Sequence, residues 1–387
     1  MQKYDYIFTG SGLSALMTVY ELILSAKFAD KTILLIDENS KKANDRTWCF
    51  WKKNNEKGNS FYNSIVSKTW DFTLFANHEL HKNLDISPYE YKMIQGIDVY
   101  NFIFNEISKH KNIHFLQEKV INFKDFEHHC IVETSNNSFS CDKVFNSIFD
   151  PQFVTNQHKY PLLHQHFIGW FIKSKEPVFN ENAATFMDFS VAQKGNTRFM
   201  YVLPTSKNQA LLEYTLFSMD LLSKEEYESE IEIYIKKLGI TSYEITEKEQ
   251  GNIPMTCYPF WKHNSKNIIH IGSAGGWTKA STGYTFKNVT KKTKQLVNFL
   301  NKESDFTKFH KKNKFWYYDL LFIDVLFKKN HLGSTIFSAL FKDKNSSLIF
   351  KFLDEETTYF EDLKIILKCP RITFLKAVFN RILASVK

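Results

Sequence analysis

The chain has 387 residues, of which 43% are hydrophobic and 16% aromatic, so it can form about two domains with a sizeable core and is not an intrinsically disordered chain. Its 37 phenylalanines indicate an interior or a ligand surface lined by aromatic rings. The net charge of +8 is local, because residues 287–344 alone carry thirteen lysines against five acidic residues, and no apolar run reaches the roughly 18 to 20 residues that span a bilayer, which argues against an integral membrane protein.

The five cysteines show no Cys-x-x-Cys spacing. This pattern argues against a structural zinc site and favours reduced thiols in a cytoplasm. No signal peptide is apparent before the first expected strand. We therefore expect a cytoplasmic protein that binds no metal.

Residues 4–37 predict a βαβ unit that binds a dinucleotide. A short apolar strand leads into Gly-Ser-Gly, a helix follows, and a second strand ends in an acid. Gly10 would make the turn, Gly12 would let a pyrophosphate approach the backbone, and Asp37 would bind the ribose hydroxyls. An ordinary βαβ turn is the alternative. The binding residues that this unit predicts are Gly10, Gly12, Leu13, Ser14, Ala15 and Asp37. The chain has no second Gly-x-Gly, so we expect one tightly bound dinucleotide.

The middle of the chain, from about residue 160 to 258, predicts a sheet with a hairpin and a helix over 223–239. The hairpin stretch ALLEYTLFS places Glu213 among leucines and a phenylalanine. A carboxylate there must be paired, solvated or kept protonated, because burying an unpaired charge is costly. Pairing with Lys207 or exposure to water competes with a role as a general acid.

Two further residues of this region are candidates for acid or base chemistry. Asp188, in TFMDF, is a second candidate acid or base, and its alternative role is to fix backbone N–H groups of a strand. His166, in LHQHFIGW, could take up a proton, although a lone histidine is more often structural.

A second glycine cluster lies between an apolar strand and a long helix, in residues 267–300. Such a strand, loop and helix direct backbone N–H groups and a helix N-terminus at an anion or an electron-rich ring. A plain glycine loop is the alternative. The residues that this loop would contribute to a binding site are Gly272, Gly275 and Gly276.

Residues 301–387 predict helices rich in lysine and aromatic side chains. The last segment, 371–387, has an apolar helical face with basic residues offset from it. This pattern suits an anionic membrane surface. A core-packed helix with a solvated basic face is the alternative.

The sequence resembles the bacterial lycopene cyclases, a family of flavoproteins whose fold is similar to that of flavin-dependent aromatic hydroxylases. The resemblance covers nearly the whole chain, and its most specific pieces are Trp-Cys-Phe-Trp and Ala-Gly-Gly-Trp-Thr-Lys. The segments that carry it are YDYIFTGSGLSA, NDRTWCFW, YPLLHQHFIGW, TFMDF, YVLPTSKNQALLEYTLFS, GNIPMTCYPF and IGSAGGWTKASTGYTFKN. Where flavin hydroxylases carry Gly-Asp in the late loop, this chain has Gly272-Ser273, which weakens the case for hydroxylase-style redox chemistry.

The resemblance implies an α/β fold with three parts. A Rossmann-type FAD-binding domain would comprise residues 1–150 plus 265–300, a β-rich substrate domain with a mixed or antiparallel sheet would comprise 151–264, and a helical, membrane-facing region would comprise 301–387. The N-terminal glycine motif and the late glycine loop would bind FAD, and Arg46 would meet its pyrophosphate. A surface loop arginine is the alternative for Arg46.

The resemblance further implies the cyclisation of the ψ-ends of lycopene, or of another acyclic carotenoid, to β-rings, giving γ-carotene and then β-carotene. FAD would act in its reduced form, with NAD(P)H as reductant and no net redox change. Glu213 would be the general acid. We expect the protein to associate peripherally with the inner face of the cell membrane and to bind no nucleic acid. A flavin oxidoreductase acting on a hydrophobic substrate, such as a hydroxylase or polyprenyl reductase, is the alternative function, and a non-catalytic membrane or nucleic-acid binder is a third.

Overall fold

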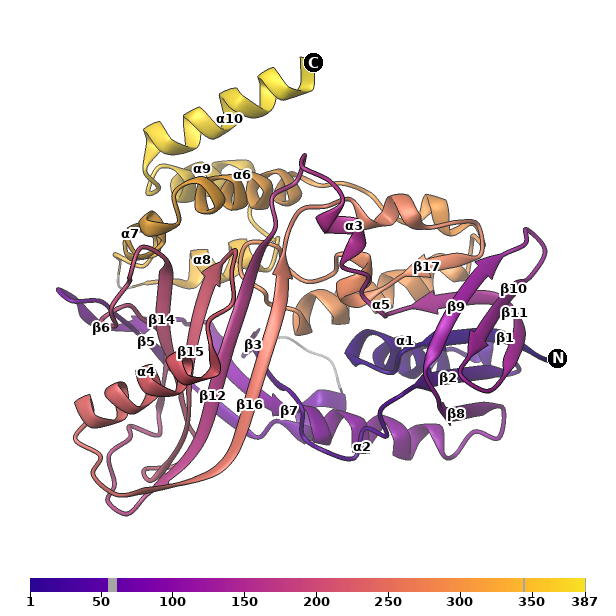
Figure 1. Cartoon of the computed structure of the whole chain (residues 1–387), viewed down its shortest axis with the longest axis horizontal. Helices are drawn as coiled ribbons and strands as arrows, with labels where there is room; N and C mark the ends of the chain where they lie inside the picture. Colours follow the sequence, from indigo (N-terminus) through magenta and orange to yellow (C-terminus); the bar gives the residue numbers. More distant parts are fainter. Residues whose placement is uncertain (55–60, 344, 387) are drawn as a thin grey trace.

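The computed structural model describes residues 1–54, 61–343 and 345–386. Two large sheets lie next to each other, and a layer of helices from the C-terminal part of the chain covers one end of the molecule (Figure 1). We call the sheet that contains the first strand the N-terminal sheet and the other the long sheet.

The N-terminal sheet has a parallel core in the order β8-β2-β1-β11-β17, and β10 and β9 extend it as an antiparallel hairpin beyond β11. Its strands are β1 (Gln2–Thr9), β2 (Ile33–Asp37), β8 (Ile113–Gln117), β9 (Val120–Asp125), β10 (Cys130–Thr134), β11 (Ser138–Asn146) and β17 (Ile268–His270). One face packs against α1 (Leu13–Ile23), α2 (Gly96–Ile107) and α5 (Phe286–Leu300). The β9–β10 hairpin packs against the other face.

The turn after β1 is held against the C-terminal end of the neighbouring strand β2. Gly10 has a φ of +90°, which a residue with a Cβ rarely adopts. Its N–H donates to the carbonyl of Ile36 at 2.7 Å, which holds the turn against the end of β2. The βαβ unit predicted from residues 4–37 is therefore confirmed as structure.

The long sheet has the order β16-β12-β15-β14-β13-β5-β6. Its strands are β5 (Phe72–Ala76), β6 (His81–Asp85), β12 (Leu163–Ser174), β13 (Ala183–Asp188), β14 (Thr197–Pro204), β15 (Gln209–Ser218) and β16 (Tyr243–Met255). The predicted hairpin is β14–β15, and the predicted helix is α4 (Lys224–Lys237), which Ser223 caps by accepting a hydrogen bond from the N–H of Glu226. The domain boundaries stay a prediction, and β5 and β6 show that this sheet also includes residues 72–85.

A small sheet joins the two large ones. It has the order β3-β7-β4, and its strands are β3 (Thr47–Lys53), β4 (Lys68–Trp70) and β7 (Tyr89–Gln95). Its aromatic residues contact the start of α5: Phe50 stacks on Phe286 with ring centroids 4.6 Å apart, and Trp51 meets Tyr284 edge-on at 4.8 Å. The Trp-Cys-Phe-Trp motif therefore packs against the segment that follows the late glycine loop.

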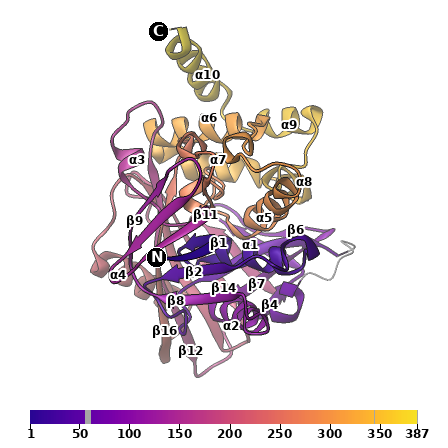
Figure 2. The same ribbon diagram turned by 90° about the vertical axis from the view of Figure 1, so that its right-hand side faces the viewer.

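The C-terminal helices cover the open end of the long sheet, and α10 projects from the body of the molecule (Figures 1 and 2). They are α6 (Lys314–Lys328), α7 (Gly333–Leu340), α8 (Ser347–Leu353), α9 (Tyr359–Ile366) and α10 (Arg371–Val386), while the short α3 (Gln152–Thr155) precedes β12. Among the described residues, no helix combines the length and the apolar character needed to cross a bilayer.

Candidate functional site

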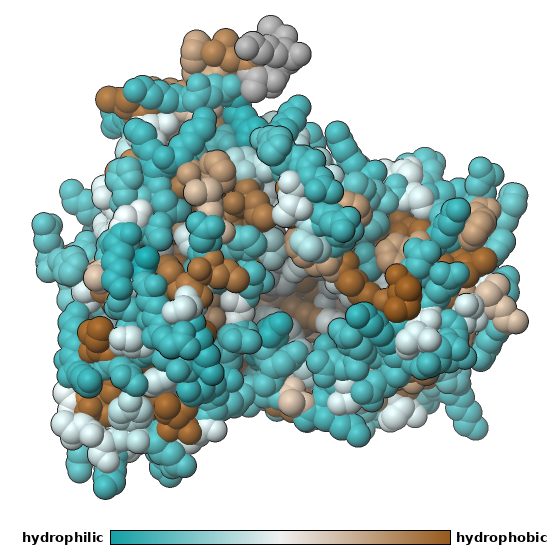
Figure 3. All heavy atoms as spheres, in the orientation of Figure 1, coloured by the Kyte–Doolittle hydropathy of each residue, from teal (hydrophilic) through white to brown (hydrophobic). Residues whose placement is uncertain are grey.

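A cavity of about 1040 Å³ lies where the three parts of the fold meet. The face of the molecule drawn in Figure 3 is hollowed between the portions that carry the two large sheets. The walls come from the turn after β1, the inner face of the long sheet, the segment before α5, and helices α6 to α10. A ligand in this cavity would contact both sheets and the C-terminal helices at once.

Most of the predicted cofactor-binding residues lie at one end of the cavity, beside the turn after β1 and the start of α1. We call this the N-terminal end of the cavity. Those that line it are Gly10, Gly12, Leu13, Ser14, Asp37, Arg46 and Gly272. Gly12 is the N-cap of α1, and a Cβ built on it would have no atom within 4 Å. Gly272 has a φ of +60° and lies so close to α1 that a Cβ would stand 2.4 Å from Ser14 Oγ. The two glycine segments therefore meet at one place, as the sequence predicts.

Three of the predicted residues do not line the cavity. Ala15 is fully buried inside α1, where it contributes to the packing of the helix on the sheet. A Cβ on Gly275 would stand 2.1 Å from the carbonyl oxygen of His270, and one on Gly276 would stand 3.0 Å from the ring of Phe260. These residues allow close packing around the site without facing its interior.

Asp37 and Arg46 carry opposite charges at this end of the cavity. One oxygen of Asp37 accepts hydrogen bonds from the N–H and the hydroxyl of Ser11 at 2.7 and 2.9 Å, and Lys41 Nζ lies 3.5 Å away. The other oxygen accepts a single hydrogen bond, from the N–H of Asn39 at 2.8 Å, so its second lone pair is available to a ribose hydroxyl. The exposed Arg46 donates to the carbonyl of Asp45 at 2.5 Å.

The donor set of the cavity fits an anionic dinucleotide. Helices α1 and α5 both begin at the cavity, and neither has an acidic residue in its first turn, so their N-terminal N–H groups and dipoles favour an anion. Further in, Gln165 Oε1 and Thr282 Oγ1 are buried and have no hydrogen-bond partner in the protein. Orphaned polar atoms of this kind are expected where a ligand supplies the missing partner.

Two buried glutamates face the cavity from neighbouring parts of the long sheet. Glu213 on β15 and Glu249 on β16 are both paired with Gly169 on β12, which lies between them. Residues directly opposite in antiparallel strands point to the same face, so both glutamates stand beside Gly169 on one face of the sheet, where their carboxyl groups interact with each other. Thr215 donates to Glu213 at 2.5 Å and Thr47 donates to Glu249 at 2.7 Å.

The surroundings of the pair favour its protonated form. Burial, and next the charge of Glu249, raise the pKa of Glu213 well above its usual range. Burial also raises the pKa of Glu249. Asp319, another acid on the cavity wall, differs because it forms an ion pair with Lys279 at 3.0 Å. Glu213 is thus neither exposed nor paired with Lys207, and its charged neighbour is a second carboxyl group, that of Glu249.

Phenol groups continue the row of side chains beyond Glu213. Tyr201 on β14 is directly opposite Glu213, and its hydroxyl contacts that of Tyr91, which in turn lies 3.0 Å from the hydroxyl of Tyr284. Burial raises the pKa of all three tyrosines well above the usual value, and raises that of the nearby Cys49 thiol to about 12. These groups are therefore neutral donors at physiological pH.

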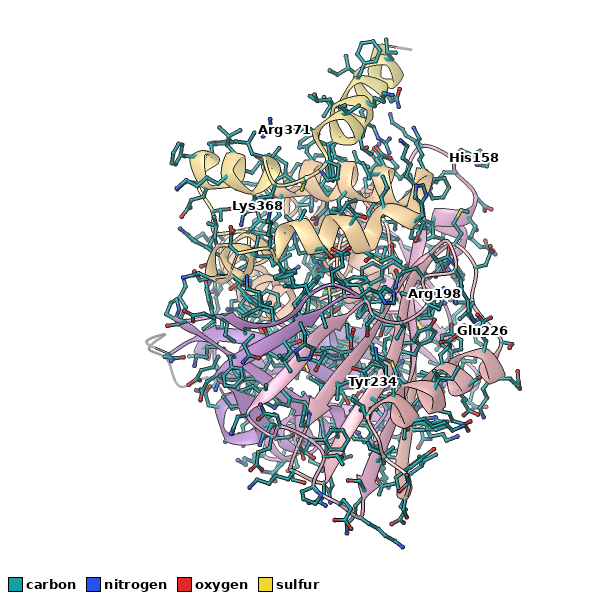
Figure 4. The ribbon with its side chains drawn as sticks, turned by 90° about the vertical axis from the view of Figure 1, so that its left-hand side faces the viewer. His158, Arg198, Glu226, Tyr234, Lys368 and Arg371 are labelled. Carbon is teal, nitrogen blue, oxygen red and sulfur yellow. The ribbon has the colours of Figure 1, made fainter. Side chains whose placement is uncertain are left out.

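Asp188 and His166 lie outside the cavity. Asp188 accepts hydrogen bonds from the hydroxyl of Tyr234 at 2.7 Å and from the N–H of Ser190 at 2.8 Å. Tyr234 belongs to α4, on the side of the long sheet away from the cavity (Figure 4). His166 is held between the hydroxyls of Tyr227 and Ser218. Asp188 thus bonds to α4 and to a backbone N–H, and His166 bonds to α4 and to the end of β15. These contacts agree with the structural roles that were the alternatives for both residues.

The sequence pattern does not identify Glu249, Tyr201 or Thr47 as residues of the site. Glu249 lies two residues before GNIPMTCYPF, but β16 carries two other acids, the exposed Glu244 and the half-buried Glu247. One more glutamate in that pattern is indistinguishable from a solvated strand residue. Only the pairing of β16 with β12 brings it to Glu213.

Solved structures share this fold at low sequence identity. A geranylgeranyl bacteriochlorophyll reductase-like protein of Thermoplasma acidophilum is 10% identical, with a TM-score of 0.59 over 97% of this chain and 98% of that chain. A flavoprotein/dehydrogenase of Cytophaga hutchinsonii is 12% identical, with a TM-score of 0.61 over 91% of this chain and 93% of that chain. The chain therefore has the flavoprotein fold that the sequence predicts.

Sequence comparisons identify the family. The capsanthin/capsorubin synthase, chromoplastic, of Citrus sinensis is 25% identical over 240 residues, which is 57% of this chain but only 45% of the relative. The chain thus matches less than half of that protein's length. The family described as "Lycopene cyclase protein" matches residues 5–379, which include both glycine segments, the long sheet and most of the C-terminal helices. On this match over nearly its whole length, the chain belongs to the lycopene cyclase family.

Proposed function

We propose that this protein is a carotenoid cyclase that converts the ψ-ends of lycopene to β-rings, first to γ-carotene and then to β-carotene, with reduced FAD and no net redox change. The buried carboxyl pair of Glu213 and Glu249 on the cavity wall is the observation that carries the proposal. Ring closure needs a proton donor in a dry, apolar chamber, and a carboxyl group there stays protonated.

FAD would bind at the N-terminal end of the cavity. Gly12 leaves open space for the pyrophosphate beside the start of α1, while Gly10 and Gly272 allow the tight backbone turns that border this space. Asp37 would bind the adenosine ribose, and Arg46 would supply a cation at the rim. The N–H groups in the first turns of α1 and α5 would supply the remaining hydrogen-bond donors to FAD. Reduced flavin, when bound, supplies negative charge near the carbocation. NAD(P)H would reduce it from solution, because the sequence has a single Gly-x-Gly motif.

Glu213 would start the reaction. Its O–H bond breaks as a C–H bond forms on the terminal alkene, the internal double bond then closes the ring on the resulting cation, and loss of one ring proton gives the product. The proton gained and the proton lost balance, so the product is an isomer of the substrate. Tyr201, which lies directly opposite Glu213, carries a neutral hydroxyl and not a cation. It therefore does not favour the ionised form of the carboxyl group.

Aromatic rings would stabilise the cation and exclude water. Phe186, Phe199, Phe217 and Tyr284 line the cavity near Glu213, and Phe186 stacks on Tyr284 with ring centroids 6.1 Å apart. The face of an aromatic ring attracts a cation, most strongly when both are desolvated. This arrangement suits a hydrocarbon substrate whose charge appears only during the reaction.

The apolar surface of α9 and α10 would bring the protein to the membrane. Its exposed residues are Tyr359, Phe360, Leu363, Ile366, Leu367, Ile372, Leu375, Val378, Phe379, Ile382 and Leu383, and apolar atoms are visible on the projecting helix in Figure 3. Arg371 stands at the junction of the two helices (Figure 4). Because Ile366, Leu375 and Val378 also line the cavity, a carotenoid could pass from the bilayer into it along this surface.

The test is the reaction itself. Purified protein loaded with FAD is incubated without oxygen with lycopene in lipid vesicles and NAD(P)H, and the products are separated and identified by absorption spectrum and mass. We expect products of unchanged mass, with no NAD(P)H lost per ring formed. Products that have gained hydrogen or oxygen, with stoichiometric loss of NAD(P)H, would establish the competing flavin oxidoreductase activity instead.

A further inference from the structure

We propose that Glu249 is a positioning residue of the cyclisation: its carboxylate shares a single proton with Glu213 and so keeps Glu213 in the acid form at neutral pH. This inference rests on the proposed function and adds to it the group that prepares the acid. No motif in the sequence points to Glu249, and its place next to Glu213 follows from the pairing of three strands.

The contact between the two carboxyl groups depends on the glycine between them. Strands β15 and β16 are separated by β12, so the backbones of Glu213 and Glu249 lie about 10 Å apart across the sheet. Their side chains must lean toward each other for the carboxyl groups to meet. A Cβ on Gly169 would stand 3.5 Å from Glu213 Cβ and 3.2 Å from Glu249 Cγ. The same Cβ would stand 2.8 Å from Leu211 Cδ1, so any larger side chain at this position would displace Leu211 and crowd the stems of both glutamates.

The pair has no direct counter-ion. Within residues 1–54, 61–343 and 345–386, neither carboxyl group forms an ion pair with a lysine, arginine or histidine, and Arg46 is the cation whose charge reaches Glu249. Two carboxylates in contact in a buried site repel each other strongly, so one proton remains on the pair.

The proton belongs on Glu213 because the two carboxyl groups have different neighbours. Both carboxyl groups accept a hydrogen bond from a threonine, Glu213 from Thr215 and Glu249 from Thr47. Among the nearby charges, that of Glu247 opposes the ionised form of Glu249 and that of Arg46 favours it. Glu213 stands beside Leu211 and Phe217, which line the same cavity wall and disfavour charge. The acid therefore faces the apolar chamber, and its anionic partner faces the polar rim.

The other titratable groups near the pair do not change charge between pH 5 and 9. They are Cys49 on β3, Tyr91 on β7, Tyr201 on β14 and Tyr284 before α5, all with raised pKa values. Glu247 on β16 and Arg46 contribute charge to Glu249 from the rim. A titration of activity in this range would therefore report on the pair.

The pair also returns the proton at the end of the reaction. When the O–H bond of Glu213 breaks and the C–H bond forms, the pair carries two negative charges beside the substrate cation. The repulsion between the two carboxylates favours recapture of the proton that the ring then releases. That proton re-forms the O–H bond, so the pair ends with the proton count it began with.

The test is the pH profile of cyclisation by the FAD-loaded protein. Activity should fall at high pH when the pair loses its last proton. In Glu249→Gln the neighbouring charge is gone, so Glu213 loses its proton more easily, and the alkaline limb should move to lower pH by about one unit or more. Glu249→Asp, which keeps the charge, should retain a limb closer to that of the unsubstituted protein. Glu244→Gln, an exposed glutamate on the same strand, is the matched control and should leave the profile unchanged.

A second substitution keeps the proposal open to refutation if Glu249→Gln does not fold. Gly169→Ala adds a methyl group 2.8 Å from Leu211 Cδ1 and 3.2 Å from Glu249 Cγ. Leu211 must then shift, and the wider spacing of the two glutamates should move the alkaline limb in the same direction. A uniform drop in rate with an unmoved limb in either folded variant would overturn the proposal and leave Glu249 a structural residue. If the unsubstituted protein makes no cyclised product, the proposed function itself fails, which is a separate outcome.

Discussion

Replacing Gly12 by valine separates the binding of the dinucleotide from the stability of the fold. Gly12 has a φ of −72° and a ψ of −179°, values open to any residue, and no atom lies within 4 Å of the position of its Cβ. Valine should therefore cause no clash within the protein, and the free energy of unfolding should change by less than about 1 kcal/mol. Its side chain would instead project toward the cavity in front of the first turn of α1.

The effect on flavin should be large. The valine would block access of a phosphate to the N–H groups of Leu13 and Ser14, and two hydrogen bonds to a charged group are worth about 1.5 to 3 kcal/mol each, which corresponds to an affinity about 10²- to 10⁴-fold weaker. Titration of the apoprotein with FAD, followed by fluorescence, measures this, and urea unfolding measures stability. Gly272→Val is the contrast, since its φ of +60° and its contact with Ser14 should also lower stability. A folded Gly12→Val protein that binds FAD within about threefold of the original affinity would refute the reasoning.

The remaining predictions concern the acid, the fold and the membrane. Glu213→Gln should lower the cyclisation rate by about 10² to 10⁴ with FAD still bound, whereas Asp188→Asn should cost stability rather than the chemical step; the reverse pattern would move the acid role to Asp188. Burial lowers the pKa of His166 to about 4, below its value in the unfolded chain, so its contribution to stability is present above pH 6.5 and is lost on acidification toward pH 4. The free energy of unfolding should fall by about 1 to 2 kcal/mol between pH 7 and 5. Urea midpoints at these two pH values should differ less in His166→Gln than in the unsubstituted protein. Phe379→Asp should weaken flotation with anionic liposomes about tenfold or more, and binding should fall at high salt, while Ile121→Asp, an equally exposed site on β9 (61% against 62%), should leave flotation unchanged.

The sequence predicts best those features whose causes are local. The turn at Gly10, the helix after it and the acid at the end of β2 follow one another within 40 residues, so their pattern specifies the βαβ unit directly. The cap at Ser223 and the polar turn of the β14–β15 hairpin are equally local. In each of these segments the preference of the chain agrees with the final structure.

The features that the sequence did not predict depend on pairing between distant segments. β5 pairs with β13 in parallel although about 110 residues separate them, and no local pattern records such a partner. Glu249 and Gly169 are similar cases, because each has an ordinary neighbourhood in sequence and acquires its role only when β12 lies between β15 and β16. The carboxyl pair is therefore a property of the sheet rather than of any motif.

The C-terminal helices form part of the site because buried ion pairs attach them to the late glycine loop. Lys279, which follows Ala-Gly-Gly-Trp-Thr, is 3% exposed and bonds to Asp319 on α6, and Lys287 at the start of α5 bonds to Asp354 after α8 at 3.0 Å. Buried charges of this kind hold one arrangement firmly, because separating either pair leaves an uncompensated charge in the interior. The loop beside α1 and the helices that line the apolar half of the cavity are thus fixed to each other. This attachment gives the lysine of the Trp-Thr-Lys sequence a structural role, because it fixes the position of α6 relative to the glycine loop. Under the proposed function, that position would also limit how far a carotenoid could extend toward Glu213.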